Sequence, residues 1–320
     1  MRILAAFALL VLNAFNALAA EPPYPLKPVR VIVPIAAGSV TDVILRAASQ
    51  ELAARMKQPL VIDNRPGASG IIGAEACAKA PPDGYTICAI YSATTSINPY
   101  VFDKLPYDPA KDFAPITNLY YVTGVLVVPA SLAVNTVDDL KALVAAKPRA
   151  VSFGTIGPGS FPEVFLTWLN RQWKAGMQAV PYKGGGPITI ALMSNEIQAS
   201  AVGLGNMIGQ LQSGQVKALA VSGSKRSPLF PGVPTFSEAG LTGFAGNLWW
   251  GLAAPAGTPK SIVARWNAEF ARLFREPRFA RFIEGQAVES ALDTPAAFAL
   301  FLARDREWTA TLSNSNQRPR

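Results

Sequence analysis

Residues 29–56 read VRVIVPIAAGSVTDVILRAASQELAARM, and the pattern in this stretch sets the fold class. Its first part, Val29 to Ile35, is an apolar, β-branched run bounded by Pro28 and Gly38, which is typical of a strand buried in a parallel sheet. In its second part, from Thr41 to Met56, apolar residues recur at helical spacing. We therefore expect a strand, a glycine-containing turn and a helix that packs on the sheet.

The same alternation continues along the chain in two series. The first series predicts further elements over residues 60–63, 71–79 and 86–91; the second predicts elements over residues 125–128, 136–146, 151–153, 162–173, 178–180, 187–194, 198–202, 207–213 and 218–221. A late apolar run, Leu248 to Ala253, can return to the first sheet, and C-terminal helices over 260–273, 277–284 and 295–312 are expected to pack back onto it. Alternating strands and helices predict open α/β sheets with right-handed crossovers. We therefore expect two lobes, lobe 1 from residues 21–124 plus 247–320 and lobe 2 from residues 125–246.

The N-terminus has the pattern of a secretory signal peptide. Arg2 supplies a positive charge, residues 3–12 are apolar, and Ala17-Leu18-Ala19 matches a small-x-small cleavage pattern. A membrane anchor is the alternative, but the apolar stretch is shorter than the roughly 20 residues that a spanning helix needs. We expect residues 1–20 to be removed and the mature chain to be periplasmic.

The chain contains no histidine, which excludes most of the usual catalytic machinery. Ser-His-Asp catalysis, Cys-His catalysis and histidine metal sites are all ruled out. An esterase that uses Ser39 or Ser160 is the remaining enzymatic hypothesis, and no G-x-S-x-G elbow supports it. The formal net charge is +8, but the basic residues are scattered and form no nucleic-acid motif. We expect no catalytic residue, no cofactor, no metal and no nucleic-acid partner.

Two pairs of residues have more than one interpretation. Cys77 and Cys88 both lie in apolar segments, where two buried thiols are the favoured interpretation. Export permits a disulfide bond between them, but the spacing cannot show whether their Cα atoms come close enough. Trp249 and Trp250 lie on the late strand and are interpreted as core packing, with a ligand-covering role for one of them as the alternative.

Three loops that follow predicted strands are candidates for binding. They are Ala37-Gly38-Ser39, the glycine-rich segment 154–160 and the hydroxyl-rich segment 92–96. Ligands of open α/β sheets bind outside the carboxyl ends of the strands, and free N–H groups at a helix N-terminus attract anions. Simple capping is the alternative for the hydroxyl residues, and Asp42 is better explained as a complement to the helix dipole than as a catalyst. Loops from both lobes can clamp one carboxylate without a full positive charge.

Short motifs along nearly the whole mature chain resemble the Bug-type extracytoplasmic solute receptors of tripartite tricarboxylate transporters. They include YPLKPVR (24–30), DNRPGA (63–68), PDGYT (82–86), PYDP (106–109), VPYKG (180–184), PGVPT (231–235) and APAGTP (254–259). The resemblance implies an α/β fold of two Rossmann-like lobes with a ligand cleft, like a type II periplasmic binding protein. It also implies a receptor that hands a small organic carboxylate to membrane transporter subunits. A sensor protein that receives the same ligand as a signal is the alternative partner.

The resemblance also implies which residues bind. In such receptors a glycine loop of each lobe holds a carboxylate, partly through ordered water. The matching positions are Ala37, Gly38 and Ser39 in the first lobe and Gly157, Gly159, Ser160 and Phe161 in the second, with Ser92, Ala93 and Thr94 lining the pocket.

The chain departs from the family pattern at three places. The first loop commonly reads Phe-Pro-Ala-Gly-Gly but ends in Ser39 in this chain; Phe161 stands in the region where a histidine often follows the second loop. Val202-Gly203 stands where several relatives carry an aspartate that could hold an ammonium group. These departures disfavour an amino acid and favour a more apolar or aromatic carboxylate. We also expect Gly38→Val to block the carboxylate position while leaving the fold intact.

Overall fold

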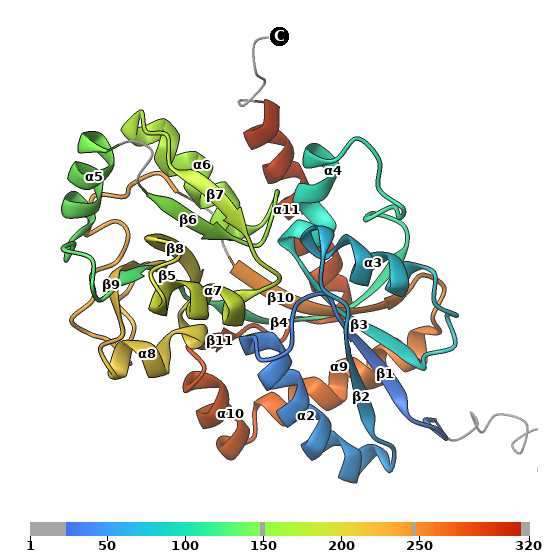
Figure 1. Cartoon of the computed structure of the whole chain (residues 1–320). Helices are drawn as coiled ribbons and strands as arrows, with labels where there is room; N and C mark the ends of the chain where they lie inside the picture. Colours follow the sequence, from blue (N-terminus) through green and yellow to red (C-terminus); the bar gives the residue numbers. More distant parts are fainter. Residues whose placement is uncertain (1–23, 148–150, 245–247, 315–320) are drawn as a thin grey trace, which may run out of the picture.

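The structure is a computed structural model of the 320-residue chain and describes residues 24–147, 151–244 and 248–314. The expected signal peptide, residues 1–20, lies outside the described residues. Two sheets with flanking helices form two lobes (Figure 1), which confirms the expected two-lobe α/β architecture. Within the described ranges, no helix combines the length and the apolar character needed to cross a membrane.

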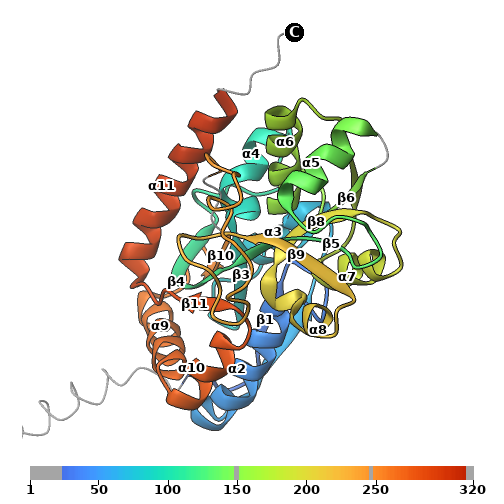
Figure 2. The same cartoon turned by 90° about the vertical axis from the view of Figure 1, so that its left-hand side faces the viewer.

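The first lobe is built on a six-stranded sheet. Its strands, in spatial order, are β11 (Val288–Ser290), β4 (Phe113–Val122), β10 (Leu248–Pro255), β3 (Thr86–Tyr91), β1 (Val29–Val33) and β2 (Leu60–Asn64). Its helices are α2 (Val40–Met56), α3 (Ile71–Ala78), α4 (Asn98–Val101), α9 (Lys260–Phe274), α10 (Pro277–Glu284) and α11 (Pro295–Asn314). Strands β3, β1 and β2 are parallel, whereas β10 runs antiparallel between β3 and β4. The late strand therefore returns to the first sheet as expected, and the C-terminal helices α9, α10 and α11 pack against the first lobe (Figure 2).

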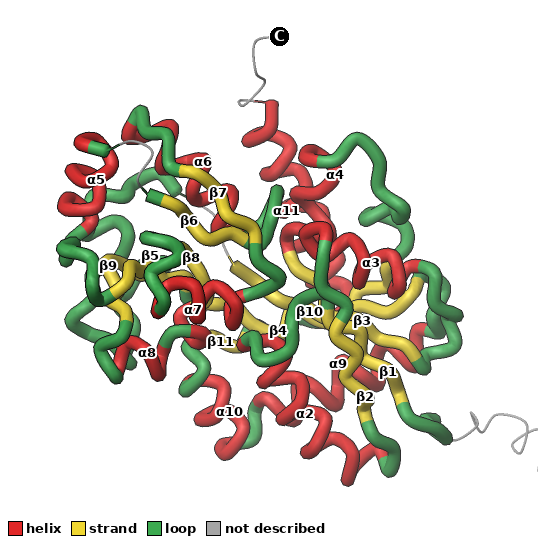
Figure 3. The backbone as a smooth tube through the Cα atoms, in the orientation of Figure 1, coloured by secondary structure: helices red, strands yellow, loops and turns green. Residues whose placement is uncertain are grey.

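The second lobe is built on a five-stranded sheet. Its strands, in spatial order, are β7 (Gln178–Pro181), β6 (Ser152–Thr155), β8 (Ala199–Gly203), β5 (Gly124–Pro129) and β9 (Val216–Val221). Its helices are α5 (Val137–Ala146), α6 (Phe161–Trp173), α7 (Gly185–Met193) and α8 (Ile208–Gln212). The chain enters this lobe where β4 runs into β5, and it leaves after β9 to reach β10 (Figure 3).

Helices cover both faces of the first sheet. On β1, Val31 lies in the apolar cluster formed with α2 and α9, while its neighbour Ile32 lies in the cluster formed with α3 and α11 on the other face. Burial on both faces explains why β1 reads as an apolar run rather than as an alternating pattern. Trp249 is fully buried in the second of these clusters, and Trp250 stacks on Tyr91, so the core interpretation of both tryptophans is confirmed.

Several elements of the described chain were not expected from the sequence. Strands β4 and β11 both join the first sheet. The hydroxyl-rich segment after β3 is not an open loop, because Ala93–Ile97 form one π-helical turn that continues into α4. Single π-helical turns are rare and frequently lie at functional sites.

Cys77 and Cys88 form a disulfide bond, with their Cα atoms 6.1 Å apart. The favoured expectation of two free buried thiols is therefore wrong. The physical reason is the packing of α3 against β3, which brings both residues into one buried cluster. This proximity depends on how α3 packs against β3 and cannot be predicted from the sequence spacing of the two cysteines.

Removing the disulfide is expected to destabilise the protein. The bond joins residues with a sequence separation of 11, and a cross-link over such a short loop contributes about 2–3 kcal/mol by restricting the unfolded chain. We expect the double variant Cys77→Ala/Cys88→Ala to lose a free energy of unfolding of that order in urea titrations. The denatured, unreduced wild type should not react with iodoacetamide, so alkylation of both cysteines would contradict the bond.

Candidate functional site

Loops at the carboxyl ends of parallel strands from both sheets meet where the two lobes face each other (Figure 1). Among the hydrogen bonds that cross this junction are those from Ala36 N–H to the Lys183 carbonyl at 3.2 Å, from Val40 N–H to Asn206 Oδ1 at 3.2 Å, and from the Ser69 hydroxyl to the Pro158 carbonyl. The first-lobe loops follow β1 and β2, and the second-lobe loops follow β6, β7 and β8. The junction therefore has the position at which open α/β sheets bind their ligands.

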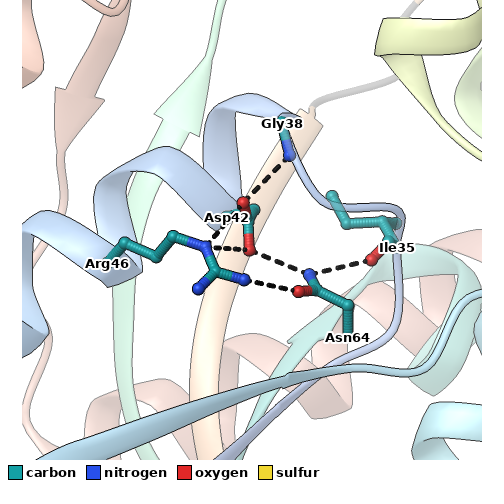
Figure 4. A network of polar contacts seen from close by, with 5 residues as sticks. All are labelled: Ile35, Gly38, Asp42, Arg46 and Asn64. Carbon is teal, nitrogen blue, oxygen red and sulfur yellow. Dashed lines mark hydrogen bonds and ion pairs between the residues drawn. The ribbon is translucent and has the colours of Figure 1, made fainter.

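Asp42 shapes the loop between β1 and α2 (Figure 4). Its Oδ2 accepts the Gly38 N–H at 2.9 Å, and its Oδ1 accepts Asn64 Nδ2 at 2.9 Å. Arg46 Nε lies 3.0 Å from both carboxylate oxygens, and Asn64 Nδ2 also donates to the Ile35 carbonyl at 3.2 Å. The Asp42 side chain is only 3% exposed. It holds the loop in shape from the inside of the first helical turn.

The protonation of Asp42 follows from these contacts. Burial acts to raise its pKa, but hydrogen bonds from Arg46, the Gly38 N–H and Asn64 outweigh burial and hold the pKa below its ordinary value. The carboxylate is therefore ionised at neutral pH. Gly38 itself has a φ of 80°, where a β-branched side chain is strained. We therefore expect Gly38→Val to distort the loop that Asp42 organises. This differs from the prediction made from the sequence, that the variant leaves the fold intact.

Helices α2 and α6 begin at the junction, and neither is capped by its own serine. Ser39 and Ser160 stand at the N-cap positions but make no side-chain bond to a helix N–H, whereas Thr136 caps α5 with a complete capping box. Simple capping is therefore wrong for both serines. The Ser160 hydroxyl donates to the Gly157 carbonyl at 2.7 Å. Ser39 Oγ is buried without a hydrogen-bond partner, beside Gly184 of the other lobe.

The glycine-rich loop between β6 and α6 contacts a different part of the first lobe. A Cβ at Gly157 would lie 3.1 Å from Ser69 Oγ, and one at Gly159 would lie 3.1 Å from Asn98 Oδ1. Both glycines adopt positive φ, 94° and 79°. The two predicted glycine loops therefore share the junction, but the second one packs on the β2 and β3 ends rather than on the Gly38 loop.

The predicted residues after β3 are mostly engaged within the protein. The Thr94 hydroxyl donates to the Tyr91 carbonyl at 2.8 Å and accepts the Tyr91 N–H at 3.1 Å. Ala93 is 1% exposed, while Ser92 is partly exposed. Of these three residues, only Ser92 has a hydroxyl that is partly exposed to solvent.

Phe161 and Gly203 lie on the second-lobe side. The Phe161 ring packs between Phe165 and Phe244, with centroid distances of 6.0 and 5.7 Å, in the core of that lobe. Gly203 ends β8, and a Cβ at this position would lie 2.9 Å from Val122 Cγ1. A side chain at position 203 therefore has little room in this arrangement of the lobes.

Sequence reasoning missed several junction residues: Ser69, Tyr91, Asn98, Lys183 and Asn206. Tyr91 ends β3, and the other four lie between two and seven residues after the carboxyl end of a parallel strand. Applying the carboxyl-end rule to every strand, and not only to those followed by glycine-rich loops, would have found them. The structure, rather than the sequence, shows that Ser69 has a left-handed φ of 53°, which non-glycine residues seldom adopt.

An open surface groove of about 640 Å³ lies elsewhere, along α9 and the start of α10, where Arg272, Arg275 and Thr294 contribute to its walls. None of the predicted site residues lines it. The groove therefore lies apart from the loops that the sequence predicts to bind.

Comparison with known proteins assigns the family. The family model described as "Tripartite tricarboxylate transporter family receptor" matches residues 44–308. The chain belongs to this receptor family. Protein BugT of Bordetella pertussis is 30% identical over 291 residues, which cover 90% of this chain and 89% of BugT. The chain therefore matches a family of receptors and not of enzymes, as the Bug-type motifs implied.

Solved structures of similar proteins agree in fold. MatC from Rhodopseudomonas palustris, solved with bound malate, has a TM-score of 0.86 and 30% identity and covers 91% of this chain and 100% of that one. Another R. palustris protein, solved with adipate, has a TM-score of 0.86 and 30% identity, with coverage of 91% and 98%.

Proposed function

We propose that this protein is a periplasmic receptor that captures a small organic carboxylate between its lobes and delivers it to the membrane subunits of a tripartite tricarboxylate-type transporter. One observation carries the proposal: Ser39 Oγ lies buried and without a partner at the N-terminus of α2, in the junction between the lobes. The malate and adipate bound by two similar proteins are both carboxylates and support the ligand class. Export with removal of residues 1–20, and lobes of residues 21–124 plus 247–320 and 125–246, complete the proposal.

The proposed anion site uses neutral donors. The Ser39 hydroxyl and the amino ends of α2 and α6 attract a carboxylate through hydrogen bonds and the helix dipoles. Ala37 and Gly38 form the exposed edge of the first loop, and Ser160 holds the second loop through its bond to Gly157. Hydrogen bonds from neutral donors act only at short range, which suits capture followed by release.

The proposed ligand is not an amino acid. Gly203 supplies no carboxylate for an ammonium group, and Val122 lies too close for a larger residue at that position. The Phe161 ring is occupied by its aromatic neighbours Phe165 and Phe244. The preference for an acid without an ammonium group therefore rests on Gly203 and not on Phe161.

The proposal predicts a carboxylate-dependent rise in melting temperature. The mature protein would be screened against aliphatic and aromatic mono-, di- and tricarboxylates and against amino acids, and the hits measured by calorimetry. A ligand that binds only the folded protein raises its melting temperature as its concentration exceeds the dissociation constant. We expect carboxylates to give this shift, and aspartate and glutamate to bind more weakly than acids without an ammonium group.

Ser39→Ala is the matched variant for this screen. It should weaken the best acid by about fivefold, the effect of losing one hydrogen bond of roughly 1 kcal/mol. The stability of the free protein should not fall, because Ser39 Oγ has no partner to lose. A protein that responds to no acid, or only to amino acids, would refute the proposed ligand class.

A further inference from the structure

A second buried hydroxyl without a partner lies in the same junction. Tyr91 is the last residue of β3 and is 8% exposed, and its hydroxyl oxygen has no hydrogen-bond partner. Buried polar groups are nearly always hydrogen-bonded, so each exception calls for an explanation. Tyr91 has no place in the family motifs considered above and did not enter the carboxylate site.

The Tyr91 ring is held firmly, so its hydroxyl cannot turn away to find a partner. The ring stacks on Trp250 with centroids 4.5 Å apart and an interplanar angle of 17°. The backbone N–H and carbonyl of Tyr91 are both bonded to the Thr94 hydroxyl. The position of the unpaired hydroxyl is therefore fixed by the packing of the ring at the carboxyl end of β3.

The direction of the hydroxyl places it at the contact between the lobes. A Cβ on Gly70 would lie 2.8 Å from the Tyr91 hydroxyl oxygen. The residue before Gly70, Ser69, donates its hydroxyl to the Pro158 carbonyl of the second lobe. The hydroxyl thus lies where the β2 and β3 ends approach the β6 loop, one strand away from Ser39, which follows β1.

The phenol acts as a neutral donor. Burial, with a smaller effect of Tyr107, raises its pKa well above the ordinary value, and no ionised side chain of the described residues contributes. A protonated hydroxyl held in one position favours a ligand that places an oxygen beside it over one that places a methyl group there. The methyl group would leave the buried donor unpaired, which is unfavourable.

We propose that the Tyr91 hydroxyl determines specificity by donating to a second oxygen of the ligand, so that the preferred acid carries a hydroxyl, carbonyl or second carboxyl group besides the carboxylate held at Ser39. The inference rests on the proposed function and names the ligand more narrowly. Sites built to bond a substrate oxygen reject analogues that lack it, because the site's own donor is then left unpaired.

The binding test uses pairs of acids that differ by one oxygen group. Suitable probes are butyrate with 4-hydroxybutyrate, butyrate with succinate, and benzoate with 4-hydroxybenzoate, each titrated into the wild type and into Tyr91→Phe. In at least one pair we expect the wild type to prefer the oxygen-bearing acid by about three- to tenfold, the range for one neutral hydrogen bond. In that pair Tyr91→Phe should bind both acids equally, with little loss for the simpler acid.

The stability test uses Tyr107 as the matched control. Tyr107 is also a buried tyrosine, 6% exposed, but its hydroxyl donates to the Thr94 carbonyl at 2.8 Å. Without ligand, Tyr91→Phe should melt at the same temperature as the wild type or higher, whereas Tyr107→Phe should melt about 2 °C or more lower. A free Tyr91→Phe protein that is destabilised as much as Tyr107→Phe would show that the hydroxyl already has a partner and would overturn the proposal.

The two levels of the proposal fail differently. If the wild type binds acids without preferring the oxygen-bearing member of any pair, or if Tyr91→Phe weakens both members equally, Tyr91 does not read a second oxygen and this inference is wrong, while the carboxylate assignment stands. If no acid binds the wild type, the carboxylate assignment falls and takes this inference with it.

Discussion

Asp42→Ala is expected to lower the free energy of unfolding by about 3 kcal/mol, the usual loss when one partner of a buried charged network is removed. The change leaves Arg46, Asn64 and the Gly38 N–H without their shared acceptor. Because these contacts shape the β1–α2 loop, the affinity for the carboxylate should fall as well, by about tenfold or more for a loss of roughly 1.4 kcal/mol. Urea titration and calorimetry measure the two effects.

The pH dependence of stability and a control variant at Asp139 distinguish the Asp42 network from the general effect of an acidic residue in the first turn of a helix. Since hydrogen bonds hold the pKa of Asp42 below its ordinary value, its stabilising contribution is present above the unfolded pKa of about 3.9 and is lost as the pH falls through the lower folded pKa. The stability gap between the wild type and Asp42→Asn should therefore narrow in acid. Asp139→Ala removes an exposed capping-box carboxylate and should have a smaller effect. Equal losses in both alanine variants would contradict a special role for Asp42.

Gly205→Ala is expected to weaken ligand binding by about 30-fold, corresponding to roughly 2 kcal/mol. A Cβ on Gly205 would lie 2.3 Å from the Gln286 carbonyl oxygen and 2.6 Å from Val40 Cγ2. Val40 starts α2 and Gln286 lies between α10 and β11, both in the first lobe, whereas Gly205 follows β8 of the second. The added methyl group therefore keeps the two lobes from approaching as closely as they do in this structure.

The alanine itself is compatible with the backbone, because Gly205 is not among the glycines with positive φ. Gly209→Ala is the matched control, since a Cβ there meets nothing within 4 Å and the backbone is again unstrained. We expect Gly209→Ala to bind like the wild type, and solution scattering to report a larger radius of gyration for Gly205→Ala with ligand present. Wild-type affinity in Gly205→Ala would mean that this close approach is not needed for binding.

Most of the fold could be predicted because it is encoded locally. The apolar run from Val29 and the helical spacing after Thr41 report burial on both faces of a sheet, and local periodicity carries that information. Strand β4 was missed because its sequence, FAPITNLYYV, includes a proline and an asparagine that weaken the strand pattern. It is stabilised by β10, which lies more than 100 residues away along the chain.

The candidate site could be predicted in outline but not in detail. The carboxyl-end rule led to Ser39, Ser160 and the segment after β3, because that rule depends only on strand direction. It could not show that the Thr94 hydroxyl hydrogen-bonds the Tyr91 backbone, or that the Phe161 ring packs in an aromatic core. The partners of these side chains depend on the tertiary structure, which decides which other residues pack beside them.

By itself, the sequence determined the alternating α/β architecture, the separation into two series of elements and the absence of histidine chemistry. Only the tertiary structure decided the pairing of Cys77 with Cys88 and the loop-shaping role of Asp42, and only it showed that the buried hydroxyls of Ser39 and Tyr91 have no partner. The physical reason is that periodicity is a property of consecutive residues, whereas a disulfide or a satisfied hydrogen bond requires two groups from different elements to meet within a few ångströms.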